Sequence, residues 1–355
     1  MASFEKRGSK YRAVVSYTDA NGVHQKTSKT FPTKKLATVW ASEMETKING
    51  GLDINAGKIT LPDYYKQWVE TYKAGTVREA TLASYTLYSG IIDDLFHDAK
   101  LSDLTTNFIQ QKINEFGKTH SRSYVSVFLA SIKASLKDAY LDGLVQRDIY
   151  SRLKANGNTL TRPENFLSVS DFEKLSDFLY DHVSDMSTEP FLLMALLALE
   201  TGARSGEIQA LTINDIHDNY ISINKSYSTV VLKVTETKNL TSIRDVSITY
   251  QLSGVLNSYI KKLNQDELFY QKFDSTYISR SMKQLTEEVG IPQIRFHGLR
   301  HSHVSYLLHN GVDIQYISKR VGHKNVSVTL STYAHMLKEK ELAQDELALN
   351  VLSKK

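Results

Sequence analysis

The feature that most constrains the fold of this chain is an unbroken apolar run at residues 191–199, FLLMALLAL. A helix that is apolar all round must be surrounded by other protein elements. The run is too short to cross a bilayer, because spanning takes about 20 apolar residues. We therefore predict a central helix inside a core large enough to cover it on every side.

The length of the chain indicates more than one core. At 355 residues it exceeds the size at which single cores stop growing, about 250 residues. Its 41% hydrophobic and 23% charged residues are typical of a soluble globular protein. Because cysteine is absent, disulfides, thiolate nucleophiles and cysteine zinc sites are excluded. The N-terminus is charged and lacks the apolar stretch of a signal peptide, so we expect a cytoplasmic protein with no membrane partner.

Residues 1–52 are expected to form a small module of a β-hairpin and a helix. Segments 11–17 and 23–31 read as strands, and the turn sequence DANG lies between them. After Pro32 an apolar residue recurs every four positions, at Leu36, Trp40, Met44 and Ile48, and Gly50 would end this helix.

The first module also carries the basic excess of the chain. Residues 1–50 hold nine Lys+Arg against four Asp+Glu, residues 51–160 thirteen against twelve, and residues 161–355 twenty-one against twenty-three. These differences of +5, +1 and −2 sum to the net charge of +4. A polyanion partner is therefore suggested for the first fifty residues.

Residues 58–155 are expected to form an all-α helical domain. Its last helix carries a stripe of Val125, Phe128, Ile132 and Leu136, which we predict to be buried. Three basic residues accompany the stripe, namely Arg122, Lys133 and Lys137. They fit either a DNA-binding face or an ordinary solvated surface. Residues 155–166 are expected to be an interdomain linker.

Residues 165–355 are expected to form a mixed α+β domain. Helices flank three alternating stretches, YISINKS, TVVLKVTETK and IRDVSITY, which read as strands. Lys238 would lie at the tip of a hairpin formed there, and the apolar helix described above would be the centre of the domain.

Four histidines gather at residues 297–309 and raise the question of a metal. His297 and His301 have the i, i+4 spacing of a helical ligand pair, but no His-Glu-x-x-His motif provides the rest of a zinc site. If Gly298 opens a helix, His297 and Arg300 share one turn of it. Two cationic donors beside free backbone amides favour an anion site instead.

Residues of the same chemical character recur elsewhere. Arg204 directly follows the apolar helix, His323 follows a glycine, and Tyr333 lies ten residues further on. Each also has a structural explanation: an arginine paired with a carboxylate, a core histidine, a core tyrosine. Lys238 could likewise be a solvated turn residue.

Taken together, these residues resemble the signature of the tyrosine recombinase (phage integrase) family. The resemblance lies in the order Arg204, Lys238, His297 with Arg300, His323 and Tyr333, and in the strings TGARSGE, HGLRHSH and VGHKNVSVTLSTYAH. It covers roughly residues 165–345. One departure is Gly298, where members of the family often carry Asp. Because that position is not catalytic, the departure puts little in doubt.

The resemblance implies a site-specific DNA recombinase that cleaves and rejoins strands through a covalent 3′-phosphotyrosine link. Tyr333 would be the nucleophile, while Arg204 and Arg300 would bind the non-bridging oxygens of the phosphate. A preorganised donor of this kind contributes about 3 to 4 kcal/mol. Lys238 would protonate the leaving 5′-oxygen. The reaction would need neither a metal nor another cofactor.

The remaining polar residues have supporting roles by the same resemblance. His297 would accept the tyrosine proton, and His323 would hydrogen-bond the phosphate. Glu207 lies one turn after Arg204, and from this spacing we expect it to orient that guanidinium. We expect His301, His303 and His309 to serve in packing or in phosphate contacts.

Both smaller domains are similar to DNA-binding domains of the family. Residues 1–52 are similar to the arm-site domain of integrases from phages and conjugative transposons, with candidate DNA contacts at Lys6, Arg7, Lys10, Arg12, Lys26 and Lys29. The helical domain 58–155 is similar to the core-site domain, with candidate contacts at Arg122, Lys133 and Lys137. Recombination implies a homotetramer on two DNA sites, and the tail 338–355 would dock on a neighbouring protomer or fold back on its own domain. An excisionase and a host DNA-bending protein are further partners that the resemblance implies.

Two other functions share some of these features. A type IB topoisomerase uses the same nucleophile but relaxes supercoils, and a DNA-binding regulator could keep the fold with an inactive site. The arm-like module and the complete set of six residues favour the recombinase.

Overall fold

The computed structural model describes residues 2–18, 22–49, 58–159, 165–236, 240–269, 272–327, 329–330, 349 and 352–353. The chain divides into two compact units, Met1–Thr161 and Arg162–Lys355. The first unit holds the N-terminal module and the helical domain, and the second holds the mixed α+β domain.

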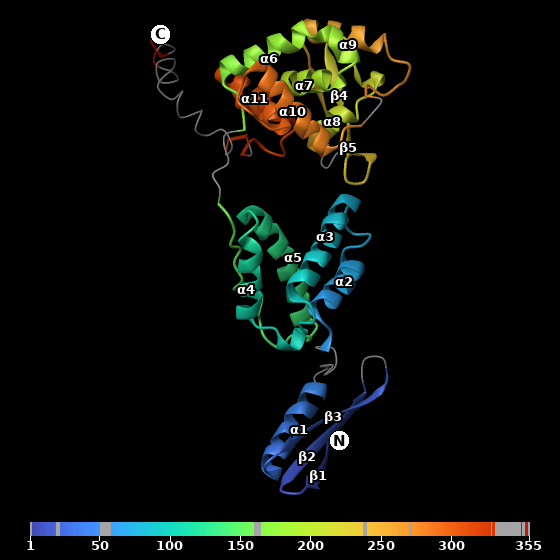
Figure 1. The fold of residues 1–355 in the computed structure, drawn as a ribbon, viewed down its shortest axis with the longest axis vertical. Helices are drawn as coiled ribbons and strands as arrows, with labels where there is room; N and C mark the ends of the chain where they lie inside the picture. Colours follow the sequence, from blue (N-terminus) through green and yellow to red (C-terminus); the bar gives the residue numbers. More distant parts are fainter. Residues whose placement is uncertain are drawn as a thin grey trace. The chain divides into compact units, whose positions relative to one another are not determined.

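The N-terminal module is a three-stranded antiparallel sheet covered on one face by a helix (Figure 1). The strands are β1 (Ala2–Arg7), β2 (Lys10–Thr18) and β3 (His24–Phe31), and they lie in that order in the sheet. Helix α1 (Lys34–Asn49) packs on the sheet through Ala37 and Ala41, which meet Ala13 and Val15 in a small buried cluster.

Two features of this module differ from the sequence prediction. The sequence predicted two strands and missed β1, although Gly8 and Ser9 between the paired residues Arg7 and Lys10 form a two-residue turn with Gly8 at a φ of 59°. The predicted four-residue stripe of α1 only partly faces the sheet, and Leu36 is 50% exposed. Four residues turn a helix through about 400°, so such a row drifts away from a flat partner.

The helical domain is all-α, as the sequence predicted, and is built from four α-helices. They are α2 (Leu61–Tyr72), α3 (Glu79–Phe96), α4 (Thr106–Gly117) and α5 (Arg122–Leu141). The side chains of Thr60, Thr105 and Ser121 accept a hydrogen bond from the first turns of α2, α4 and α5 and so fix where these helices begin. The predicted stripe on α5 is confirmed, because Val125, Phe128, Ile132 and Leu136 are fully buried.

The segment that follows α5 stays attached to this domain further than the linker prediction implies. The amide of Asn158 donates to the carbonyl of His120 at 3.0 Å, and its own carbonyl accepts from Arg122 at 3.2 Å. A Cβ on Gly117 would lie 2.1 Å from the carbonyl oxygen of Asn156, so only glycine permits this approach. Up to Asn158 the predicted linker is therefore hydrogen-bonded to the corner between α4 and α5.

The second unit is built around α7 (Pro190–Thr201). Residues 191–199 are all buried, with exposed fractions between 0 and 7%, so the predicted central helix is confirmed. Figure 1 shows this helix among its neighbours, which are α6 (Val169–Asp181), α8 (Ser205–Gln209), α9 (Tyr250–Ile260), α10 (Ser275–Val289) and α11 (Phe296–His309). Helix α12 (Ile314–Val321) packs on α11. Nowhere in the described ranges is a helix long and apolar enough to cross a membrane.

The strands of this unit pair differently from the sequence expectation. Strand β4 (Tyr220–Ile223) pairs with β7 (Arg244–Ser247), and β5 (Lys225–Ser228) pairs with β6 (Lys233–Glu236). The turn of the β5–β6 hairpin therefore lies at residues 229–232, and within the described ranges β6 and β7 do not pair with each other. Lys238 itself lies outside the described residues.

Candidate active site

The turn that links α7 to α8 positions the first candidate, Arg204. Gly202 ends α7 in the left-handed region, with a φ of 66°, and a Cβ there would lie 2.8 Å from the His303 ring. Arg204 is the N-cap residue of α8, and Glu207, one turn later, binds both the backbone and the side chain of Arg204. The carboxylate accepts from the Arg204 amide at 2.9 Å and from Nη1 of its guanidinium at 2.7 Å. The Arg204 side chain remains 40% exposed.

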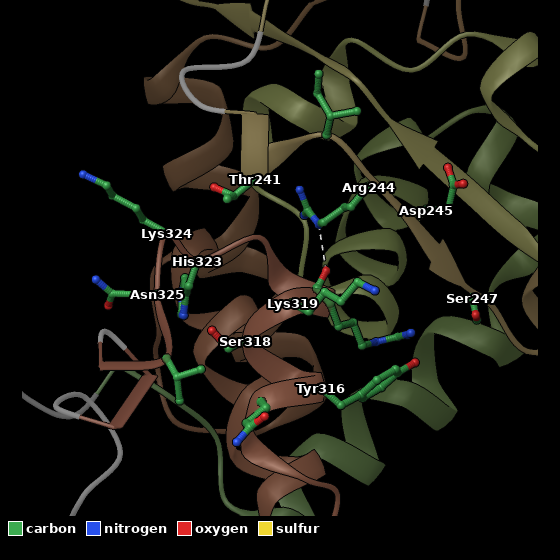
Figure 2. Close-up of a pocket in the computed structure, with 14 residues that line it drawn as sticks. Thr241, Arg244, Asp245, Ser247, Tyr316, Ser318, Lys319, His323, Lys324 and Asn325 are labelled. Carbon is green, nitrogen blue, oxygen red and sulfur yellow. Dashed lines mark hydrogen bonds between the residues drawn. The ribbon is translucent and has the colours of Figure 1, made fainter.

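Glu207 also contacts a second arginine, Arg244 on β7, which the sequence analysis missed. Nη2 of Arg244 donates to Glu207 at 3.0 Å, and Nη1 donates to the carbonyl of Ser242. Its Nε donates to the carbonyl of Arg320 at 2.7 Å, the bond drawn as a dashed line in Figure 2. The side chains of Arg244 and Glu207 are only 5% and 3% exposed. The available signal was Arg244 sharing the inward face of β7 with Val246.

The charge state of Glu207 follows from these contacts. Burial alone would raise the pKa of its carboxyl, but the guanidiniums of Arg244 and Arg204 and the hydrogen bonds they donate hold the pKa below its usual value. Glu207 is therefore ionised at neutral pH and fixes the orientation of both arginines.

Helix α11 brings Arg300 to the same turn. Nη1 of Arg300 donates to the carbonyl of Gly202 at 2.7 Å, and the residue is 3% exposed. His297, one turn earlier on α11, keeps part of its surface exposed to solvent while the surrounding groups cover the rest. The two predicted arginines thus meet at residues 202–204, although Arg204 and Arg300 are far apart in the sequence.

His297 and His323 share one electrostatic environment. Burial lowers the pKa of His297 to about 4, and the nearby His301, Arg300 and Arg204 add to this effect. The pKa of His323 is likewise lowered to about 4 by burial and by the charges of Arg300 and Arg204. Nδ1 of His323 lies 2.7 Å from the hydroxyl of Thr329. Both imidazoles are therefore neutral at pH 7 and stand beside two positive guanidiniums, an arrangement suited to an anion.

The other three histidines fall into different settings. His303 is 4% exposed, and its ring bridges the carbonyl of Leu199, 2.8 Å from Nδ1, and Nε of Arg320, 3.1 Å from Nε2. Burial and the charge of Arg320 lower its pKa to about 3, so it is a neutral packing residue. His301 lies edge-to-face against His297 at 4.9 Å, and His309 is exposed in the last turn of α11.

Two of the six candidate catalytic residues, Lys238 and Tyr333, lie outside the described residues. The structure brings together the other four, Arg204, His297, Arg300 and His323. In the part of the chain that is described, no group of three His, Asp or Glu side chains could hold a metal ion.

A cavity of about 670 Å³ adjoins the site on the side of His323 (Figure 2). Strand β7, helix α12 and the loop that follows α12 line it, and its walls include basic Lys319 and Lys324. Ile243 and Tyr316 also line the cavity and are about half exposed, so it offers both apolar and cationic surface.

The register of the N-terminal sheet divides the predicted arm-site contacts into two sets. Arg12 pairs with Glu5 and Thr30, on the face opposite to Ala13 and therefore opposite to α1. Arg7, Lys10 and Lys26 share this open face by the same alternation, whereas Lys6 and Lys29 share the face of Ala13. Arg12 is held in place by a 2.8 Å hydrogen bond to Ser28.

The predicted contacts on α5 also differ from one another. Lys133 is partly buried, and its ammonium donates to the carbonyl of Ser151 at 3.3 Å, so it has a structural partner. Arg122 and Lys137 are exposed.

Three family models match the chain and follow the organisation described above. The model of the phage integrase family matches residues 165–340, that of the phage integrase N-terminal SAM-like domain matches residues 60–117, and that of the arm DNA-binding domain matches residues 3–48.

Similar proteins are recombinases and integrases. A XerC-like tyrosine recombinase of Caldanaerobacter subterraneus is 23% identical, with 89% of each chain covered. The integrase of Staphylococcus phage L54a is 23% identical over 85% of this chain and 96% of its own length. The ICEBs1 integrase of Bacillus subtilis is 35% identical, but over only 41% of this chain and 46% of its own length.

Solved structures share the fold. The Tn1549 transposon integrase in complex with transposon right end DNA superposes with a TM-score of 0.67 at 17% identity, covering 81% of this chain and 99% of that one. A lambda integrase dimer bound to a core site gives a TM-score of 0.60 at 18% identity, with 93% of each chain covered.

Proposed function

Since the chain belongs to the phage integrase family of tyrosine recombinases, we propose that it integrates and excises a mobile element by cutting and rejoining DNA through Tyr333. The observation that carries this proposal is the meeting of Arg204, Arg300, His297 and His323 around the turn between α7 and α8. Two guanidiniums beside two neutral imidazoles fit a backbone phosphate.

The arginines address the main barrier of the reaction. A free tyrosine has a pKa of about 10, so deprotonating its hydroxyl at pH 7 costs roughly 4 kcal/mol. The pentavalent phosphorus carries negative charge on its non-bridging oxygens, and a fixed donor there contributes about 3 to 4 kcal/mol. Arg204 and Arg300 stay protonated and are held in place by Glu207 and by the carbonyl of Gly202.

The histidines and Lys238 would carry out the proton transfers and support the phosphate. His297 is neutral at pH 7, since burial lowers its pKa to about 4, and the negative charge of a bound phosphate would raise that pKa so that the imidazole can take the proton of the Tyr333 hydroxyl. His323 would hydrogen-bond the phosphate, and Lys238 would give a proton to the leaving 5′-oxygen. The P–O bond to the 5′-oxygen breaks as the bond to Tyr333 forms. Attack by a 5′-hydroxyl reverses the step, so the exchange consumes no ATP.

We also propose the DNA partners and the assembly. Duplex attachment sites would be held by the helical domain at core sites, with Arg122 and Lys137 as contacts, and by the N-terminal sheet at arm sites. One neighbour in fold is a lambda integrase tetramer bound to a Holliday junction, and a homotetramer is proposed here on that likeness. An excisionase and a DNA-bending host protein would control direction, and the cytoplasm would be the place of action.

The open face of the N-terminal sheet is the surface proposed to enter a DNA groove. Arg7, Lys10, Arg12 and Lys26 project from it, and a two-stranded or wider ribbon fits the major groove. Alanine at these positions should weaken arm-site binding and lower its salt dependence more than alanine at Lys6 or Lys29.

The tail 338–355 falls almost wholly outside the described residues. We propose that it docks on a neighbouring protomer, because the cavity between β7 and α12 offers apolar Ile243 and Tyr316 to such a segment. Deleting the tail should abolish recombination and leave binding of a single protomer intact. Recombination at the wild-type rate would contradict this assignment.

The decisive experiment is covalent trapping. The element's junction and flanking DNA supply the attachment site, and a nicked duplex of that site prevents religation after cleavage. The wild-type chain should form a protein–DNA adduct, and Tyr333→Phe should form none. No adduct from the wild type would indicate an inactive regulator. Relaxation of supercoils without exchange between two sites would indicate a topoisomerase.

A further inference from the structure

Helix α11 begins without a side-chain cap of its own. Its N-cap residue is Arg295, whose side chain makes no capping bond. In a capping box the side chain three positions after the N-cap accepts a hydrogen bond from the N-cap amide. That position in α11 is Gly298, which has no side chain. The helix that carries His297 and Arg300 therefore lacks the residue that would close its first turn.

Asn165, at the start of the second unit, fills this role from outside the helix. Its Oδ1 accepts from the Arg295 amide at 2.7 Å. Gly298 makes room for it, since a Cβ at 298 would lie 2.7 Å from the carbonyl oxygen of Asn165 and 2.9 Å from its Oδ1. The bond that a capping box forms within a helix is formed here by a residue far away in the sequence.

A second contact fixes the same segment one turn further along α11. The amide of Leu167 donates to the hydroxyl of Ser302 at 2.9 Å, and that hydroxyl donates to the carbonyl of Gly298 at 2.8 Å. Leu167 and Ser302 are 3% and 1% exposed. We call these contacts of Asn165 and Leu167 with α11 the linker staple.

We propose that Asn165 is a positioning residue for the reaction, because through the linker staple it fixes the first turn of α11 and with it His297 and Arg300. The inference rests on the proposed function for its catalytic consequence. A helix end without a cap frays, and a displacement of about 1 Å at a catalytic group can slow a reaction up to about a hundredfold. Asn165 acts through Arg295 and Gly298 and need not touch DNA.

Single-turnover cleavage of the nicked duplex by the full-length chain tests the proposal. Asn165→Ala should slow cleavage by about tenfold at saturating DNA, while the affinity for the core site stays unchanged. Asn165→Asp keeps an acceptor oxygen at the same place and should cleave within about twofold of wild type. Cleavage by Asn165→Ala at the wild-type rate would overturn the proposal, and so would an Asn165→Asp variant as slow as Asn165→Ala.

Ser168→Ala is the matched control. The Ser168 hydroxyl accepts from the Asp171 amide and caps α6, so its loss destabilises the same unit without touching α11. Its melting temperature should fall at least as far as that of Asn165→Ala, and its cleavage rate should stay at the wild-type value. Equal slowing in both variants would mean that Asn165 acts on stability alone.

Exchanging the two positions sharpens the test. In the variant Gly298→Asp the new side chain would be crowded by Asn165, and this variant should cleave slowly. The double variant N165A/G298D moves the acceptor into the helix, and it should cleave faster than either single variant. Failure to exceed both would show that the two positions do not share one role.

Hydrogen exchange separates this inference from the proposed function. The amide of Arg295, which loses its acceptor, and that of Gly298, which donates to the carbonyl of Arg295 at 2.7 Å, should exchange faster in Asn165→Ala than in wild type, whatever the chain catalyses. If the wild type forms no adduct, the proposed function fails while the exchange result still decides the role of Asn165. Unchanged exchange would overturn that role even in an active enzyme.

Discussion

Helices α8 and α11 each contribute an arginine to the candidate site, and both arginines meet at the turn between α7 and α8, but the two helices are held in different ways. Arg204 is itself the N-cap of α8, and Glu207 one turn later accepts from both its amide and its guanidinium. Helix α11 has Gly298 at the equivalent position and takes its acceptor from Asn165. One arginine is thus oriented by its own helix, and the other depends on a segment more than a hundred residues away.

The difference shows how a site can combine a local and a long-range support. The bond between Arg204 and Glu207 forms as soon as α8 forms, because the two residues lie on one turn. The linker staple forms only once the segment before α6 has packed on α11, since its bonds join residues more than a hundred positions apart in the chain. Three measurements would break or sharpen this contrast.

The largest effect is expected from Glu207→Ala. The substitution leaves the guanidinium of Arg244 buried without its carboxylate, and breaking a buried ion pair in this way costs about 3 to 5 kcal/mol of unfolding free energy. Urea denaturation measures the loss. The control is Glu287→Ala, whose ion pair with Lys283 is more than half exposed and whose removal should leave stability near the wild-type value. A similar small effect at Glu207 would mean that α8 is not held by this carboxylate.

An intermediate loss of stability is expected on acidification. The contribution of His303 on α11 should be lost at a higher pH than the contribution of Glu207 on α8. The pKa of His303 is lowered to about 3 in the folded chain, against about 6.5 when unfolded. The contribution of neutral His303 to the unfolding free energy is therefore complete above pH 6.5. It is lost as the pH falls, and about 2 kcal/mol is lost by pH 5. The lowered pKa of Glu207 also contributes stability above its unfolded pKa, but that contribution is lost only below about pH 4.5.

Denaturation at several pH values tests the order of these two windows. His303→Gln should reduce the slope of unfolding free energy against pH between pH 6 and 5, and the slope is informative even if the variant is less stable overall. A slope identical to that of wild type would show that His303 does not titrate in this range.

The smallest effect is expected from Ser302→Ala in the linker staple. The substitution leaves the buried amide of Leu167 without its acceptor, which costs about 1 to 2 kcal/mol. Thermal unfolding gives the value. Ser279→Ala is the control, because the Ser279 hydroxyl is exposed and bonds only to the backbone of its own helix. Equal melting temperatures for the two variants would show that the Ser302 hydroxyl does not stabilise the linker staple.

The local support could be predicted from the sequence, and the long-range one could not. The spacing of Arg204 and Glu207 places them on one turn, and the role expected for Glu207 needed no knowledge of the fold. Gly298 was noted only as a departure, because nothing near it in the sequence points to Asn165. Arg244 was missed for the same reason, since its partners lie on α8 and α12.

The elements themselves followed the same rule. The central helix and the stripe on α5 depend on periodicity within one segment, and both were predicted correctly. The pairing of β5 with β6 and of β4 with β7 depends on which strands meet, and the alternating pattern of each strand is the same for either pairing. The strand β1 was missed because its charged residues mask its alternation.

The turn at Gly202 has a consequence for how the protein would meet DNA. Its carbonyl holds Arg300, and two residues later the chain presents Arg204, so the spacing of the two positive groups is set by covalent geometry and one hydrogen bond. The two guanidiniums are therefore already in place before a phosphate binds between them. Little entropy would then be lost in gathering these groups, and more of the interaction free energy would remain for bending the double helix.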